Sequence, residues 1–136
     1  MAALDRPVAK PRPVYLNLFA IRQPLPAIVS ILHRISGALL FLIGIPLLLW
    51  VVQRALASPD AWAQMRTALG HPVAKLTLLV LAWAYFHHFL AGIRHLVMDT
   101  GAAFELGVNK TFAILTIVGS IVLTAAVWFY VLGVAK

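Results

Sequence analysis

The sequence predicts an all-α integral membrane protein with three transmembrane helices. Hydrophobic residues make up 62% of the 136-residue chain and charged residues only 11%, whereas a soluble domain carries about 25% charged residues. Three stretches, residues 35–53, 76–93 and 111–135, contain no Asp, Glu, Lys or Arg. Because a bilayer core needs about 20 mostly apolar residues per helix, we expect helices over residues 30–54, 73–98 and 109–135.

The composition also excludes several classes of function. The chain has no cysteine, so it forms no disulfide, ligates no iron–sulfur cluster through cysteine and offers no thiol nucleophile. Its formal net charge is +7, but the basic residues flank the apolar runs and do not form a continuous patch. This distribution disfavours nucleic acid as a partner. The composition indicates a lipid bilayer as the main surrounding of the chain.

An N-terminal arm, residues 1–29, is predicted to precede a transmembrane domain of residues 30–136. Residues 15–21 are too apolar for a solvated tail, so we expect the arm to dock on a soluble partner or to lie in the membrane interface. The first apolar run is longer than the core of a usual signal peptide, and we expect no cleaved leader. Prolines interrupt any continuous helix in the arm: Pro7, Pro11, Pro13, Pro24 and Pro26.

Turn and capping residues subdivide the transmembrane domain. Pro46 lies inside the first span, where we expect it to kink the helix. In the connection to the second span, Ser58 or Asp60 is expected to cap a short helix over residues 61–69. The Gly-His-Pro sequence at residues 70–72 is expected to end this short helix before the second span begins.

The distribution of basic residues predicts the orientation of the chain. Seven of the 11 Lys and Arg residues fall on the side of the N-terminus if the chain crosses the membrane three times. The positive-inside rule then places the N-terminus inside and the C-terminus outside. The seven residues are Arg6, Lys10, Arg12, Arg22, Arg34, Arg94 and Lys110. Candidate aromatic anchors at the outer ends are Trp50, Trp62, Trp128 and Tyr130.

A first cluster of polar residues lies at the inner end of the first span. Polar groups in a span are costly in lipid, so each one is informative. Ser30, His33, Arg34 and Gly37 occupy positions i, i+3, i+4 and i+7, which lie along one stripe of a helix. We expect a hydroxyl, an imidazole and a guanidinium to converge beside a residue without a side chain. The alternative is an interface anchor, in which Arg34 contacts lipid phosphate.

A second cluster places two imidazoles on one face of the second span. His88, Gly92 and His95 occupy positions i, i+4 and i+7, and this face is expected to let a flat macrocycle approach the backbone. His87 points about 100° away and must face other neighbours. An interhelical hydrogen bond is the alternative role for a membrane histidine. The residues expected alongside His88 are Ala84, Tyr85 and Ala91.

The two clusters resemble the signatures of a known family, the cytochrome b membrane-anchor subunits (C subunits) of succinate dehydrogenase, or respiratory complex II. The first signature resembles SILHRISG at residues 30–37, preceded by the pairs Arg12-Pro13 and Ile21-Arg22. The second resembles His87-His88 followed by GIRH at residues 92–95 and by Asp99. The resemblance covers nearly the whole chain in order, with the same three-span layout.

The resemblance implies roles for particular residues. In the family, the histidine four residues before the glycine of the second signature ligates haem b, which implies His88 as one axial ligand. The serine and arginine of the first signature line the ubiquinone pocket, which implies Ser30 and Arg34. The His-Arg pair also lies near the haem propionates, which implies His33 and Arg34, with His95 as a further neighbour. No catalytic residue is expected in this chain.

The resemblance also implies partners and a location. The expected partners are a flavoprotein subunit, an iron–sulfur subunit and a second, smaller membrane-anchor subunit that shares haem b and supplies its other ligand. Electrons then pass from succinate to ubiquinone in a bacterial cytoplasmic membrane, rather than in the mitochondrial inner membrane. The alternatives are a haem-free anchor, a fumarate reductase anchor that uses a low-potential quinone, and a small proton channel or transporter.

Overall fold

The computed structural model describes residue 17 and residues 20–134, with the backbone alone for residues 132–134. Most of the predicted arm (residues 1–16, 18 and 19) lies outside the described residues, as do residues 135 and 136. The described part is helical. Its elements are α1 Leu25–Leu39, the π-helical turn η1 Leu40–Gly44, α2 Ile45–Ala57, α3 Pro59–Gly70, α4 Pro72–Asp99 and α5 Leu106–Val134.

Three stretches of helix are long and apolar enough to cross a membrane. The first is the continuous path of α1, η1 and α2, Leu25–Ala57, and the others are Pro72–Asp99 and Leu106–Val131. The prediction of an all-helical chain with three candidate spans is therefore confirmed, while its orientation stays a prediction. Many large apolar side chains are exposed, including Phe41 at 69%, which suits a surface covered by lipid or by partner subunits.

The first helix begins at Leu25, earlier than the expected start at residue 30. Pro24, with an extended backbone, occupies the N-cap position without a side-chain hydrogen bond, and Pro26 lies in the first turn. A proline is tolerated there because the N–H that it lacks would have had no partner within the helix. Pro26, which the sequence analysis assigned to the arm, is thus a helical residue.

Pro46 alters the helical geometry of the turn that precedes it in the first span. Proline donates no hydrogen bond to the carbonyl four residues earlier, and its ring crowds that carbonyl. The preceding turn, Leu40–Gly44, widens into a π-helix, at the end of which the N–H of Ile45 bonds the carbonyl of Leu40. The expected perturbation at Pro46 therefore takes the form of a π-helical turn inside a continuous helix.

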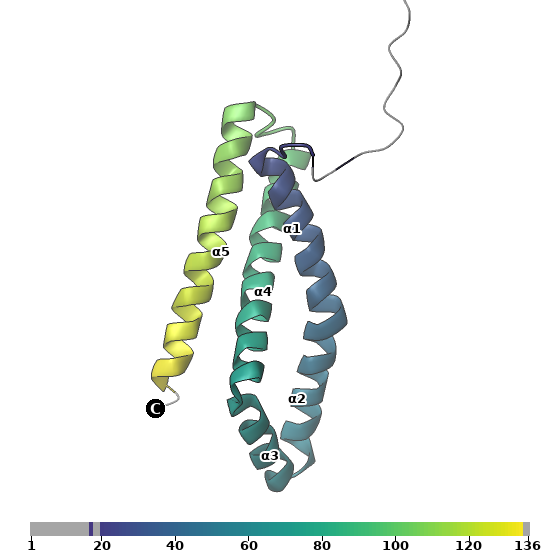
Figure 1. Cartoon of the computed structure of the whole chain (residues 1–136), viewed down its shortest axis with the longest axis vertical. Helices are drawn as coiled ribbons and strands as arrows, with labels where there is room; N and C mark the ends of the chain where they lie inside the picture. Colours follow the sequence, from purple (N-terminus) through teal and green to yellow (C-terminus); the bar gives the residue numbers. More distant parts are fainter. Residues whose placement is uncertain (1–16, 18–19, 135–136) are drawn as a thin grey trace, which may run out of the picture.

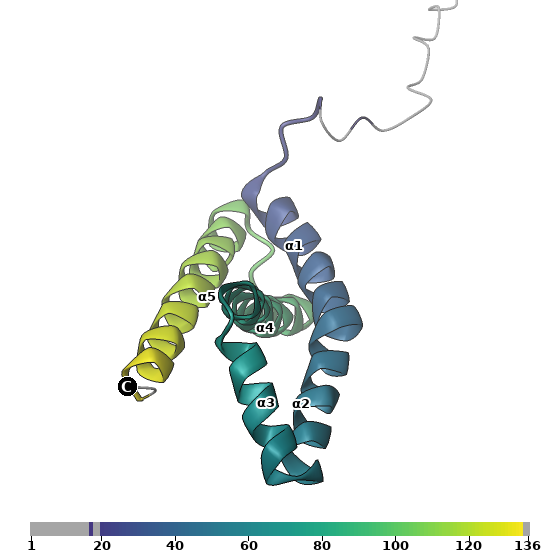
Figure 2. The same ribbon diagram turned by 60° about the horizontal axis from the view of Figure 1, so that its bottom comes forward.

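The short helix α3 joins the first span to the second. The hydroxyl of Ser58 accepts a hydrogen bond from the N–H of Ala61 at 3.1 Å, so Ser58 rather than Asp60 caps this helix. After Gly70, Nδ1 of His71 accepts from the N–H of Val73 at 3.3 Å and caps α4. Figure 2 shows α3 running back beside α2.

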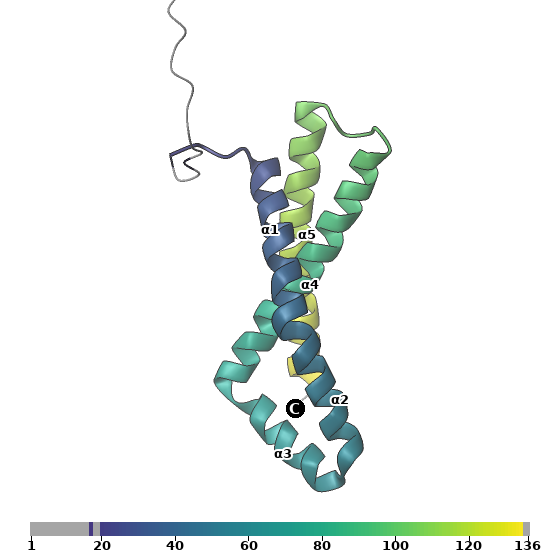
Figure 3. The same cartoon turned by 90° about the vertical axis from the view of Figure 1, so that its right-hand side faces the viewer.

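Helix α4 occupies the centre of the bundle, between α1 and α5 (Figure 1). Val29 of α1, Ala91 of α4 and Ala113 of α5 meet in one cluster, and none of them is exposed. Small side chains such as alanine allow membrane helices to approach closely. Figure 3 shows that the first span crosses α4 near the junction of α1 and α2, and that α2 diverges from the path of α4 and α3 beyond the crossing. We call the end where α4 is joined to α5 the loop end, and the opposite end the α3 end.

Candidate functional site

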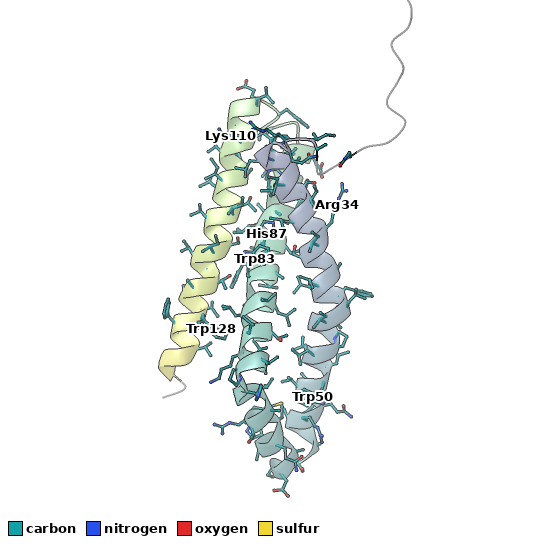
Figure 4. The ribbon with its side chains drawn as sticks, viewed as in Figure 1. Arg34, Trp50, Trp83, His87, Lys110 and Trp128 are labelled. Carbon is teal, nitrogen blue, oxygen red and sulfur yellow. The ribbon has the colours of Figure 1, made fainter. Side chains whose placement is uncertain are left out.

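The two adjacent histidines of α4 face different neighbours, as expected. His87 is fully buried, and its ring stacks on that of Trp83 with 5.2 Å between centroids (Figure 4). Ala84, His87, Ala91 and Arg94 are the buried residues of α4, and their spacing places them along one stripe, which we call the packed face. Ala84 and Ala91, expected beside His88, thus belong with His87, because the neighbouring helices close over that stripe.

His88 lies against the backbone of α1. Its Nδ1 atom is 3.0 Å from the carbonyl oxygen of His33 and 3.4 Å from the hydroxyl of Ser36. The rings of His88 and His33 are stacked, with 4.2 Å between centroids and 17° between planes. The ring of His95 lies 5.1 Å from that of His33. The structure thus brings together three predicted site residues, His33, His88 and His95, which we call the histidine cluster.

Gly37 provides the space for the ring of His88. An added Cβ at Gly37 would lie 2.8 Å from Cε1 of His88, closer than real Cβ contacts allow. From the sequence, the imidazole of His33, on the same stripe of α1, was expected to lie beside Gly37. The imidazole that approaches Gly37 is instead that of His88, from α4, across the helix interface.

Neither Ser30 nor Arg34 forms a hydrogen bond with the histidine cluster within the described residues. Ser30 is half-buried and Arg34 is exposed, and Figure 4 shows Arg34 on the side of α1 that points away from α4. Consecutive residues of a helix point about 100° apart, so His33 and Arg34 cannot both face α4. The predicted convergence of hydroxyl, imidazole and guanidinium is not seen among the described residues, and Arg34 is instead exposed on the outer side of α1 (Figure 4).

A buried arginine was not singled out as a site residue from the sequence. Arg94 is only 3% exposed, and its Nη2 atom donates a hydrogen bond to Oδ1 of Asn109 in α5. Its Nε and Nη1 atoms are buried without a partner among the described residues. Arg94 follows the charge-free run of residues 76–93, near the loop end of α4, and a charge buried there is costly; its position was available in the sequence. The sequence alone did not identify its hydrogen-bond partner, Asn109 of α5.

The fold and the site define a class of protein: a three-span integral membrane subunit that carries a histidine cluster between two of its helices. The family described as "Succinate dehydrogenase/Fumarate reductase transmembrane subunit" matches residues 8–127. The chain belongs to this family. It is a subunit of succinate dehydrogenase, a succinate:quinone oxidoreductase, of the type called the cytochrome b556 subunit.

Individual relatives agree with this assignment. The chain is 43% identical to the succinate dehydrogenase cytochrome b556 subunit of Coxiella burnetii over 91 residues, which cover 66% of this chain and 72% of the relative. It is 37% identical to that of Paracoccus denitrificans over 112 residues, 82% of this chain and 85% of the relative. It is 27% identical to that of Rickettsia conorii over 129 residues, 94% and 99% of the two chains.

Proposed function

We propose that this anchor subunit holds haem b through His88 and contributes Ser30 and Arg34 to a ubiquinone-reduction site. The observation that carries the proposal is the 3.0 Å contact between Nδ1 of His88 and the carbonyl of His33. A carbonyl only accepts hydrogen bonds, so Nδ1 carries the proton and Nε2 keeps the lone pair that binds a metal. Metal-ligating histidines commonly donate their other N–H to a carbonyl in this way.

The surroundings of His88 fit a haem that is shared with another subunit. Within the described residues, its hydrogen-bond contacts both involve Nδ1. Large side chains on the exposed surfaces of α1 and α4 are available to a partner, among them Ile31, Ile35, Tyr85 and Phe89. The smaller anchor subunit would supply the other ligand of the haem, while His33, His95 and Arg34 would offer N–H groups to its propionates. Bound haem supplies a one-electron carrier.

Ser30 and Arg34 lie one helical turn apart on α1, where they suit a quinone with two carbonyl oxygens. The hydroxyl of Ser30 donates a hydrogen bond to one oxygen or to its water. Arg34 offers a permanent positive charge and several N–H donors to a quinone that gains negative charge. Because Arg34 points away from α4 (Figure 4), the remaining walls of this pocket belong to partner subunits.

We infer that the loop end faces the cytoplasm, with the N-terminus inside and the C-terminus outside the bacterial cytoplasmic membrane. The excess of basic residues on the N-terminal side supports this orientation. Lys110 lies at the loop end, and Trp50 and Trp128 lie toward the α3 end (Figure 4). The flavoprotein and iron–sulfur subunits dock at the loop end, with the part of the predicted arm that precedes α1 in their contact, and Ser30 and Arg34 then lie near the electron donor.

Replacing each of the adjacent histidines tests the haem assignment. In the purified membrane complex, His88→Leu is expected to lose the low-spin optical and electron paramagnetic resonance spectra of a haem with two histidine ligands. His87→Leu, the matched control, is expected to keep them because His87 lies on the packed face of α4 and not beside His33. The criterion is low-spin character, since the partner's ligand can retain the haem. An unchanged spectrum in the His88 variant would contradict the assignment.

The ratio of two activities tests the quinone site. Losing one hydrogen bond in a desolvated site costs about 1–3 kcal/mol, so Ser30→Ala should lower quinone reduction roughly five- to a hundredfold. Arg34→Leu should lower it further, and Arg34→Lys should retain part of it because the charge stays. Succinate oxidation with phenazine methosulfate should survive in all three. Parallel loss of both rates would indicate a role in assembly, and loss of neither would place the pocket elsewhere.

A further inference from the structure

The ring of His88 is held against the backbone of α1 by one of its edges. An added Cβ at Gly37 would lie 2.8 Å from Cε1 and 3.1 Å from Nδ1, but 3.8 Å from Nε2. The Nδ1–Cε1 edge therefore fills the space that any side chain at position 37 would occupy. Nε2 is the ring nitrogen that lies farther from α1.

The carbonyl of His33 receives two hydrogen bonds from side chains. The hydroxyl of Ser36 donates to it at 2.9 Å within α1, and Nδ1 of His88 donates to it at 3.0 Å across the helix interface. The Ser36 oxygen lies 3.4 Å from Nδ1, at the long limit of a hydrogen bond. Ser36 and His88 thus share one acceptor, and Ser36 itself is fully buried.

We propose that Gly37, Ser36 and the carbonyl of His33 form a seat that positions His88 and sets its strength as a haem ligand. The inference rests on the proposed function of His88. The carbonyl keeps the proton on Nδ1, Gly37 sets how closely the ring approaches, and Ser36 weakens the His88 bond by sharing the carbonyl. These are positioning groups, since they act on the metal only through His88.

The seat has a measurable electronic effect. A stronger hydrogen bond from Nδ1 raises the basicity of an imidazole ligand. A more basic ligand favours oxidised over reduced iron and therefore lowers the midpoint potential of the haem. Lengthening the bond between His88 and the His33 carbonyl raises that potential, and shortening the bond lowers it.

Two substitutions in the seat are expected to shift the haem midpoint potential in opposite directions. Gly37→Ala places a methyl group where the ring lies, lengthens the bond from Nδ1 and raises the potential. Ser36→Ala removes the competing donor, shortens the same bond and lowers the potential. The measurement is a redox titration of haem absorbance in the assembled membrane complex, with electron paramagnetic resonance of the oxidised haem as a second readout.

Gly44→Ala is the matched control on the same span. Its added Cβ would make ordinary contacts of 3.5 Å and 3.8 Å with Leu40, so the potential should stay at the wild-type value. Shifts of the Gly37 and Ser36 variants in the same direction, or no shift in either, would overturn the seat. If the Gly37→Ala complex does not assemble, the potential of Ser36→Ala alone tests the seat, because this substitution adds no atoms. An unchanged or raised potential would then overturn the proposal.

The His88→Leu variant separates the two proposals. A low-spin spectrum that survives in His88→Leu overturns haem ligation by His88, and the seat with it. A low-spin spectrum lost in His88→Leu, together with wild-type potentials in both seat variants, overturns the seat alone.

Discussion

The polar side chains on the packed face of α4 and those on the face that carries His88 differ in their hydrogen bonding. On the packed face, both ring nitrogens of His87 and two guanidinium nitrogens of Arg94 are buried without a partner among the described residues. On the other face, Nδ1 of His88 contacts two groups of α1. The buried histidine is held by packing, and the half-buried one by the contacts of its Nδ1 atom with α1. The difference supports the proposal that His88, the more accessible of the two adjacent histidines, is the one that binds haem.

The packed face depends on close helix approach, so enlarging Ala91 should have the largest effect. Ala91→Leu adds bulk where α1, α4 and α5 meet, and overpacking of this kind typically costs about 1–3 kcal/mol or more. We expect a lower thermal midpoint of the purified complex and a lower yield. Ala126→Leu, at an exposed position of α5, is the control and should change little. Equal losses in the two variants would contradict the central role of the Ala91 contact.

Asn109 is the partner of a buried charge, and removing it should have the next largest effect. Asn109→Ala leaves the guanidinium of Arg94 without the hydrogen bond that joins α4 to α5. The expected loss of stability is about 0.6–3 kcal/mol, from the average for hydrogen bonds in membrane proteins to the upper value for bonds to charged groups. A double-mutant cycle with Arg94→Leu measures the coupling energy in mixed micelles. A coupling energy of zero would show that this contact contributes nothing to stability.

His87 should show an effect of the opposite sign. Its unpartnered ring nitrogens carry a desolvation cost that an apolar side chain does not. His87→Leu is therefore expected to keep or raise the thermal midpoint of the complex, with a gain of up to about 1–3 kcal/mol. A clear decrease would mean that the imidazole has a hydrogen-bond partner, either the backbone of Val29 in α1 or a group of the assembled enzyme, and the contrast between the two faces of α4 would disappear.

The hydroxyls of α5 should have the smallest effect. Thr116 is buried on α5, but its hydroxyl donates to the carbonyl of Phe112 in the same helix, at 2.9 Å. Thr116→Val keeps the shape and removes only this local bond, so the change in stability should be less than about 1 kcal/mol. Thermal unfolding of the complex measures it. A larger loss would reveal that the Thr116 hydroxyl also forms a hydrogen bond with another helix.

Local patterns in the sequence were sufficient for the spans and for the separation of His87 from His88. Charge-free lengths identify the spans, and the helical period places neighbouring residues in different directions. The same period could not say which face of α1 meets α4, because the rotation of each helix is decided by packing. The contact between Gly37 and His88, and the exposed position of Arg34, therefore required the structure. Asn109 was equally beyond local reasoning, since its link to Arg94 depends on the register of α5.

During synthesis, α1 leaves the ribosome before His88, the α4 residue that contacts it in the folded chain. His88 follows Ser36 by 52 residues, and such a segment takes about 3–10 s to translate at about 5–20 residues per second. In that interval α4 has not yet been synthesised and cannot pack against the first span. The bond from the Ser36 hydroxyl to the carbonyl of His33, at 2.9 Å within α1, satisfies the hydroxyl before its neighbour exists. Ser36 thus occupies one side of the His33 carbonyl from the start of synthesis, and His88 later joins it on the same acceptor.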